Sequence, residues 1–193
     1  MYRKRENKIL GKNIVHYNKL DSTQKEILRQ IEKNEIENGT IIIADIQTDG
    51  IGTHGRSWHT TEENNIAFSF VLYLDTKIEN LKNLTIEIAE IFVKIFKDLY
   101  NIKIQIKDPN DLVIDDKKVG GILTQTKLQG DNVKNLVVGI GINTNQTKFP
   151  KEIKDIATSI KKKFSISIDN QKVIEEFCNI FEEKIIKMLG EKK

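Results

Sequence analysis

Charged side chains gather in a short stretch, Lys107 to Leu123, whose pattern predicts a hairpin suited to an anionic ligand. Pro, Asn and Asp at positions 109–111 form a turn signature, because Pro fixes φ and Asn and Asp bond their own backbone. The apolar run Leu112 to Ile114 predicts a strand, Asp115-Asp116 a hairpin turn, and Lys117-Lys118 the start of a second strand. That second strand runs into two glycines, which usually mark a bulge or a close approach to the backbone. Such a hairpin could hold an anion with its metal ion, although a plain surface hairpin would show the same pattern.

A glycine-rich loop at positions 47–58 is the second candidate for ligand chemistry. It follows a β-branched run, Thr40 to Ile46, which predicts a buried strand. Three glycines in six residues permit unusual φ angles and a close backbone approach, as in cradles for phosphate or carboxylate. The loop also carries Arg56 and the only tryptophan, Trp58. We therefore expect this loop to contribute to an anion site.

Hydroxyl side chains precede a predicted helix at Asp21-Ser22-Thr23. Thr23 and Glu26 have the spacing of a capping box, and Ile27, Leu28 and Ile31 supply an apolar face. The hydroxyls could serve as helix caps alone. Hydroxyls and free N–H groups at a helix start also suit a polar ligand head group.

The remaining elements must position these three segments. Apolar residues at helical spacing predict one helix from about Leu81 to Tyr100 and a final helix whose apolar face runs from Val173 to Leu189. Alternating or β-branched runs predict further strands at Asn13–Asn18, Asn65–Leu74, Lys103–Ile106 and Asn135–Asn143. A chain of 193 residues is long enough for one substantial core.

The amino-acid composition limits the classes of binding partner and the cellular compartment that we expect. A net charge of +3 is too small to indicate nucleic-acid or membrane binding. The single cysteine, Cys178, cannot form an internal disulfide, and no signal peptide or membrane-spanning run is present, so we expect a cytoplasmic protein. The three histidines lack metal-ligand spacing.

Taken together, five blocks in this order resemble the biotin–protein ligases. They are Leu20-Asp21-Ser22-Thr23, Gln47 to Trp58, Lys107 to Leu123, Gly139 to Asn143, and Ala157 to Ile160. This sequence departs from the family pattern at Gln24, where Asn is common, at Ile51 and Thr53, where arginines are usual, and at Asp108, where Trp is usual.

The resemblance implies an α+β fold with a mixed, largely antiparallel sheet flanked by helices. This fold is shared with lipoyl ligases and is akin to the cores of class II aminoacyl-tRNA synthetases. It also implies a single catalytic domain over residues 1–193, with neither an N-terminal DNA-binding domain nor a C-terminal SH3-like domain.

The implied reaction joins biotin to ATP as biotinyl-5′-AMP, with Mg²⁺ as the metal, and then transfers biotin to a lysine of a biotin carboxyl carrier protein. Lys118 and Arg56 would be catalytic, and Asp111 would bind Mg²⁺. The residues implied to bind biotin are Ser22, Thr23, Gln24, Gln47, Gly50, Ile51, Gly52, Thr53, Lys118 and Gly121. Those implied to bind ATP are Gly55, Arg56, Trp58, Lys107, Asn110 and Asn143.

Other interpretations remain open at this stage. A lipoate–protein ligase shares the fold and the chemistry. Ile51, Thr53 and Asp108 favour a non-catalytic adenylate-binding relative. A biotin-responsive repressor is disfavoured by the short N-terminal region. The oligomeric state, including a homodimer, is not determined by the sequence.

Overall fold

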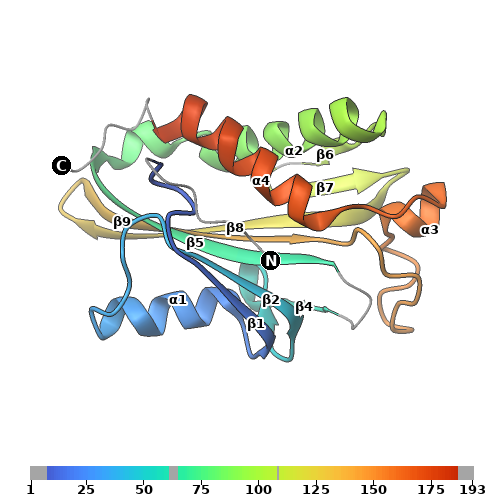
Figure 1. The fold of residues 1–193 in the computed structure, drawn as a ribbon, viewed down its shortest axis with the longest axis horizontal. Helices are drawn as coiled ribbons and strands as arrows, with labels where there is room; N and C mark the ends of the chain where they lie inside the picture. Colours follow the sequence, from blue (N-terminus) through green and yellow to red (C-terminus); the bar gives the residue numbers. More distant parts are fainter. Residues whose placement is uncertain (1–7, 61–64, 108, 187–193) are drawn as a thin grey trace.

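The computed structural model describes residues 8–60, 65–107 and 109–186. These residues form a seven-stranded mixed sheet in the order β1-β2-β5-β9-β8-β7-β6, in which β1 pairs with β2 in parallel and the other pairs are antiparallel. Helix α1 covers one face and helices α2 and α4 cover the other (Figure 1). The predicted α+β fold is confirmed.

The strands of the large sheet are β1 Ile14–Leu20, β2 Ile41–Gln47, β5 Ile66–Lys77, β6 Gln105–Lys107, β7 Asp111–Ile114, β8 Lys117–Gln129 and β9 Asn132–Ile142. The helices are α1 Thr23–Glu32, α2 Leu84–Tyr100, α3 Ile160–Phe164 and α4 Asn170–Phe181.

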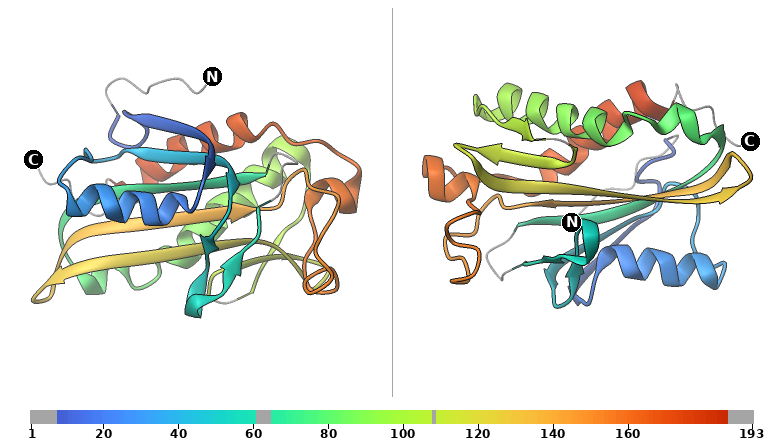
Figure 2. Two further views of the ribbon diagram at one scale, coloured as in Figure 1. Left: turned by 90° about the horizontal axis from the view of Figure 1, so that it is seen from below. Right: turned by 180° about the vertical axis from the view of Figure 1, so that it is seen from behind.

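Side chains along the central strands point alternately to the two faces of the sheet, and both faces receive apolar residues. In β2, Ile41 and Ile43 join the core beneath α2 and α4, whereas Ile42 faces α1. Successive side chains of a strand point to opposite faces, so an unbroken isoleucine run suits a strand that is covered on both sides. The smaller core under α1 also contains Ile27, Val71 and Val137. Figure 2 shows α1 lying across the sheet on this side.

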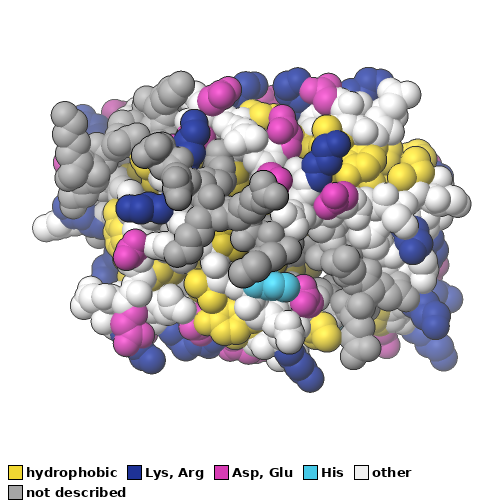
Figure 3. Space-filling view, in the orientation of Figure 1, with side chains coloured by type: hydrophobic (Ala, Val, Ile, Leu, Met, Phe, Trp, Pro, Cys, Tyr) yellow, Lys and Arg dark blue, Asp and Glu magenta, His cyan; other side chains and the backbone are white. Residues whose placement is uncertain are grey.

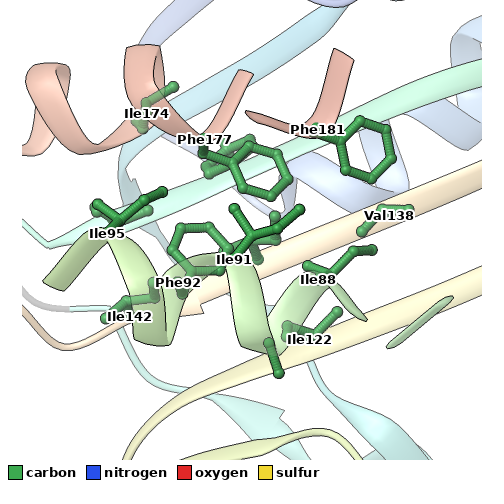
Figure 4. Packing of buried hydrophobic residues seen from close by; sticks show 14 of the residues in the cluster. Ile88, Ile91, Phe92, Ile95, Ile122, Val138, Ile142, Ile174, Phe177 and Phe181 are labelled. Carbon is green, nitrogen blue, oxygen red and sulfur yellow. The ribbon is translucent and has the colours of Figure 1, made fainter. Parts of the chain in front are cut away.

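The larger core is built around phenylalanines between α2, α4 and the sheet (Figure 4). Phe177 of α4 stacks on Phe92 of α2, with ring centroids 4.7 Å apart. Phe177 also contacts Phe68 of β5 edge-on at 5.6 Å. These ring contacts pack helices α2 and α4 against each other and against strand β5.

A separate two-stranded hairpin lies on the same side of the large sheet as α1 (Figure 1). It pairs β3 (Gly50–Ile51) with β4 (Ser57–Trp58), and the turn η1 (Thr53–Gly55) joins them. Gly50 is required here because a Cβ would lie 2.6 Å from the carbonyl oxygen of Trp58. The glycine-rich loop is therefore partly ordered as a hairpin.

Several helix boundaries in the structure differ from those that the sequence predicts. The predicted capping box of Thr23 with Glu26 is wrong: Ser22 is the N-cap and accepts from Lys25 N–H at 3.5 Å. The helix expected from about Leu81 begins at Leu84, after a 3₁₀ turn, η2 (Ile78–Leu81). The final helix passes into a π-helical turn, η3 (Glu182–Ile186), and Leu189 lies outside the described residues.

The surface carries both signs of charge. Lys, Arg, Asp and Glu side chains are interspersed over the face in Figure 3, as the small net charge predicts. Within the described ranges, no helix is both long and apolar enough to cross a membrane.

Candidate active site

The start of α1 is held against the end of β2 by backbone pairing that continues beyond the strands. Thr48 N–H donates to the Leu20 carbonyl at 2.9 Å, and Asp49 N–H donates to the Asp21 carbonyl at 2.8 Å. The Thr23 N–H can therefore donate to Gln47 Oε1 at 2.8 Å. Two segments that are separate in the sequence thus form one polar wall.

An ion pair locks this helix start. Arg29, two turns along α1, donates to both carboxylate oxygens of Asp21 at 2.7 and 2.8 Å. Those bonds are the main cause of an Asp21 pKa lowered to about 2, and the Ser22 N–H adds to the effect. Arg29 also donates to Glu26. The pair holds the backbone immediately before Ser22 and Thr23.

Asp21→Asn should remove a modest, pH-dependent contribution to stability. The folded pKa lies below the ordinary value of 3.8, so the contribution is fully present above about pH 4 and is lost as pH falls towards 2. Solvent screens this exposed pair, so we expect less than about 1 kcal/mol. Urea unfolding of both proteins between pH 7 and 2 measures it. A stability difference that stays constant down to pH 2 would contradict the ion-pair assignment.

A one-residue bulge directs Lys118 into the site. Opposite β7, Val113 pairs with Lys118 but Leu112 pairs with Gly120, so Val119 is the extra residue. Without the bulge, strand alternation would place Lys118 and Gly121 on opposite faces. With it, both line the same cavity while Val119 enters the core. The predicted turn is confirmed, since Asp115 and Asp116 have φ of 46° and 63°, as a two-residue hairpin of this type requires.

The Ala157-Thr158 segment fixes the backbone of Lys118 on its other side. Lys118 N–H donates to the Ile156 carbonyl at 2.8 Å, and Thr158 N–H donates to the Lys118 carbonyl at 2.9 Å. The Asn143 side chain in turn donates to the Thr158 carbonyl at 3.1 Å. The last two sequence blocks thus position the lysine of the third block.

The Lys118 ammonium is held between a carboxylate and an aromatic ring. Its Nζ lies 2.6 Å from Asp111 Oδ1 and 5.8 Å from the centroid of the Trp58 ring. The Trp58 indole lies against Gly121 and Gly141. This arrangement keeps a half-buried cation in place for an anionic ligand.

Lys118 and Trp58 stand between two hollows and line both of them. The first is a small cavity of about 40 Å³, and the second is an open cleft of about 400 Å³. The first cavity joins nearly all of the residues implied to bind biotin: Ser22, Thr23, Gln24, Gln47, Ile51, Gly52, Thr53, Lys118 and Gly121. Gly50 is the exception: it pairs with Trp58 in the β3–β4 hairpin and does not line the cavity.

The residues implied to bind ATP are only partly brought together. Arg56, Trp58 and Asn143 line the open cleft. Asn110 lines the first cavity instead, where its amide donates to the Ile122 carbonyl at 3.1 Å. Lys107 and Gly55 are exposed and line neither hollow.

The structure also adds residues that the sequence did not single out for the site. Ser69 of β5 lines the first cavity and bonds the Thr23 hydroxyl at 2.8 Å. The sequence feature that could have identified Ser69 is a single hydroxyl side chain within an apolar run of the strand. Gly139 and Gly141, from the fourth of the five sequence blocks, line the first cavity. Gln146 and Ile156 line the second.

Comparison with known proteins agrees with this geometry. Residues 17–143 match the model of the biotin/lipoate A/B protein ligase family. The chain belongs to this family. It is 33% identical to a biotin protein ligase from Aquifex aeolicus solved in complex with biotin and ATP, with a TM-score of 0.71 over 90% of this chain and 73% of that one.

Other biotin/lipoate ligase family members show the same pattern. The biotin acetyl coenzyme A carboxylase synthetase of Helicobacter pylori, solved with bound biotinylated ATP, is 26% identical with a TM-score of 0.70, over 92% of this chain and 78% of that one. The bifunctional ligase/repressor BirA of Bacillus subtilis is 36% identical over 91% of this chain. The match spans about half (54%) of that relative's length. The predicted family is confirmed.

Proposed function

We propose that this chain activates biotin with ATP as biotinyl-5′-AMP and transfers the biotinyl group to a lysine of a biotin carboxyl carrier protein. The observation that carries the proposal is the position of Lys118, which lines both the polar cavity and the open cleft. A ligand in each hollow would present its reacting end to this one cation. The ligases of known structure with biotin and ATP bound support this assignment.

The first reaction step brings two anions together. A biotin carboxylate oxygen attacks the α-phosphorus of ATP, and the bond from that phosphorus to pyrophosphate breaks. Lys118 would offset the negative charge that builds up on the transferring phosphoryl group, which is the dominant requirement for such a step. In the second step the carrier lysine amine attacks the biotinyl carbonyl carbon, loses a proton, and AMP leaves.

The first cavity must widen before it can hold biotin. A volume of about 40 Å³ accommodates a few waters, whereas ligand pockets are typically about 300–1,000 Å³. The hairpin of β3 and β4 covers this cavity and does not pair with the large sheet. Displacement of that hairpin is therefore the change that would admit biotin. The cleft of about 400 Å³ is already within the range for a nucleotide.

Magnesium would be held mainly by the nucleotide. Its usual role in such sites is to neutralise phosphate charge. Among the described residues, no group of three acidic, histidine or cysteine side chains is placed to bind a metal. The Asp111 carboxylate is paired with Lys118 in this structure, and a single carboxylate could join the phosphate oxygens in holding the ion. Asp111 as a metal ligand stays a prediction.

The polar end of the first cavity favours biotin over lipoate. Thr23, Gln24 and Ser69 present hydroxyl and amide groups there. A cyclic urea can bond such groups, whereas a dithiolane ring would leave Gln24 Oε1, which has no partner among the described residues, unpaired at a cost of roughly 1–3 kcal/mol. A reducing, cytoplasmic setting completes the proposal and is supported by the single cysteine of the chain, which cannot form an internal disulfide.

Pyrophosphate release tests the proposed activity. The purified chain is incubated with ATP, Mg²⁺ and either biotin or lipoate, and transfer to a purified carrier domain is then measured. We expect biotin-dependent release and biotinylation of the carrier. Release with lipoate alone would assign the lipoate activity, and no release with either acid would favour a non-catalytic relative.

The loop's departures from the family pattern predict how firmly the adenylate is held. Arg56 donates to Thr53 Oγ1 at 3.1 Å and to the Thr53 carbonyl at 3.3 Å, and it is the arginine that lines the cleft. Thr53 offers only a neutral hydroxyl. A charge-assisted hydrogen bond to phosphate contributes roughly 1.5–3 kcal/mol. The loss or gain of one such bond should therefore change the dissociation rate of biotinyl-AMP about tenfold or more.

We therefore expect Thr53→Arg to slow dissociation of labelled biotinyl-AMP and Arg56→Ala to quicken it about tenfold. The measurement is the release rate from the two variants and the unmodified protein. Lys103→Ala, at an exposed position outside both hollows, serves as the control. An unchanged or faster release from Thr53→Arg would show that another segment holds the phosphate.

A further inference from the structure

One short segment beside the open cleft holds a concentration of lysines. Residues 148–163, here called the lysine segment, contain six lysines and two acidic residues, a net charge of +4. The whole chain carries +3, so the remainder of the chain has a net charge of −1. All six lysines are exposed: Lys148, Lys151, Lys154, Lys161, Lys162 and Lys163. The net positive charge of this protein therefore comes from one segment.

Contacts within and around the lysine segment bring its two halves together. The Lys162 ammonium of α3 lies 5.1 Å from the centroid of the Phe149 ring, at the other end of the segment. Lys161 N–H donates to the Thr144 carbonyl at 2.9 Å, which ties α3 to the loop that follows β9. In Figures 1 and 2, α3 and that loop lie together at one end of the molecule. The lysine segment is thus one continuous basic surface.

Most of this charge is not neutralised within the protein. Lys163 pairs with Asp115 of the β7–β8 turn. The other five lysines form no ion pair with another described residue. Apolar side chains lie among them, since Ile156 is 65% exposed and Phe164 is 38% exposed. Interfaces with nucleic acid are more polar than those between proteins, so this mixture favours an acidic protein partner.

The lysine segment also forms part of the rim of the open cleft. Ile153 and Ile156 line the cleft, and Lys154 lies between them in the chain. In the proposed reaction, the lysine amine of the carrier must enter through the mouth of this cleft. A lysine side chain is short, so the carrier surface around that lysine must lie against the rim.

We propose that the lysine segment is the docking surface for the carrier domain, and that it binds an acidic patch beside the biotin-accepting lysine. This inference rests on the proposed function and names the feature by which the protein substrate is recognised. Opposite charges raise the association rate of two proteins, and salt screens the effect. The six lysines line neither hollow, so the lysine segment acts on the transfer step alone.

Transfer from preformed biotinyl-AMP to a purified carrier domain tests the docking surface. The test variant reverses three charges: Lys151→Glu, Lys154→Glu and Lys161→Glu. Its kcat/KM for the carrier should fall about tenfold or more at low salt, mainly through KM. This difference should largely disappear at 1 M salt, where the Debye length is about 3 Å. Formation of the adenylate from biotin and ATP should stay within about twofold of normal, as for most surface substitutions.

A matched control reverses three exposed lysines elsewhere: Lys33→Glu, Lys82→Glu and Lys127→Glu. They lie at the end of α1, before α2 and near the β8–β9 turn, which are at the opposite end of the molecule from α3 (Figure 1). The control has the same net charge as the test variant, and it should transfer biotin as the unmodified protein does. Thermal unfolding checks all variants, and Lys154→Glu alone should show a smaller loss if the triple variant does not fold.

The carrier side of the contact is tested by changing the carboxylates around its accepting lysine to amides. Transfer by the unmodified protein should then fall by a similar factor and lose its salt dependence. Equal losses in the test and control variants, or a parallel loss of adenylate formation, would overturn this inference alone. Tighter binding of a random DNA duplex than of the carrier would assign the surface to nucleic acid and overturn it too. Failure of the unmodified protein to form biotinyl-AMP or to transfer biotin would overturn the proposed function as well.

Discussion

Lys118→Ala should lower the rate of biotinyl-adenylate formation by roughly two to three orders of magnitude while the fold is retained. Removing one preorganised electrostatic contact to a developing charge typically costs about 3–4 kcal/mol of barrier. Lys118 is half-buried and forms no part of the apolar core, so its loss leaves the phenylalanine cluster intact. Single-turnover formation of labelled adenylate, at saturating biotin and ATP, measures the effect.

The neighbouring lysine provides a matched control. Lys117 is exposed, precedes the bulge and lines neither hollow. Lys117→Ala should therefore change the rate by less than about threefold, in keeping with the small effect of most surface substitutions. Thermal unfolding of both variants checks the fold. Near-normal adenylate formation by Lys118→Ala would show that another group provides the catalytic charge.

The sequence was a good guide to the elements because their patterns are local. The isoleucine run of β2 and the helical spacing of α2 each depend on the neighbours of a residue along the chain. The two aspartates between β7 and β8 were recognisable as a turn for the same reason. Most of the residues that the resemblance implied to bind biotin line the first cavity.

What the sequence missed depends on contacts between distant segments. The face of β8 that Lys118 occupies is set by a bulge of one residue, which a glycine pair suggests but does not locate. Ser22 and Thr23 are both able to cap a helix, and only the structure shows that Ser22 is the cap while Thr23 bonds Gln47 of β2. The bond from the Asn110 amide to the Ile122 carbonyl, twelve residues along the chain, likewise follows from the pairing of β7 with β8.

The wall between the two hollows depends on the absence of a side chain at position 141. A Cβ on Gly141 would lie 2.3–2.6 Å from ring atoms of Trp58, well inside contact distance. Gly141 sits in β9, opposite Gly121 of β8 and Ala67 of β5. Its φ is not in the left-handed region, so a β-branched residue suits the backbone there. A substitution at this position should therefore act through Trp58.

Gly141→Val should accordingly lower kcat/KM for adenylate formation by about a hundredfold. Relief of the overlap moves the indole by about an ångström, and misplacement on that scale at a reacting centre costs about 10²-fold. Both KM values should change, because Trp58 lines the cavity and the cleft. The decisive measurement is a double-mutant cycle with Trp58→Ala, which removes the ring that the new valine side chain would strike. We expect the double variant to be no slower than Trp58→Ala alone. If the losses in kcat/KM of the two single variants were fully additive, the introduced valine would act through the sheet. The reaction would then not depend on the Trp58 ring that separates the cavity from the cleft.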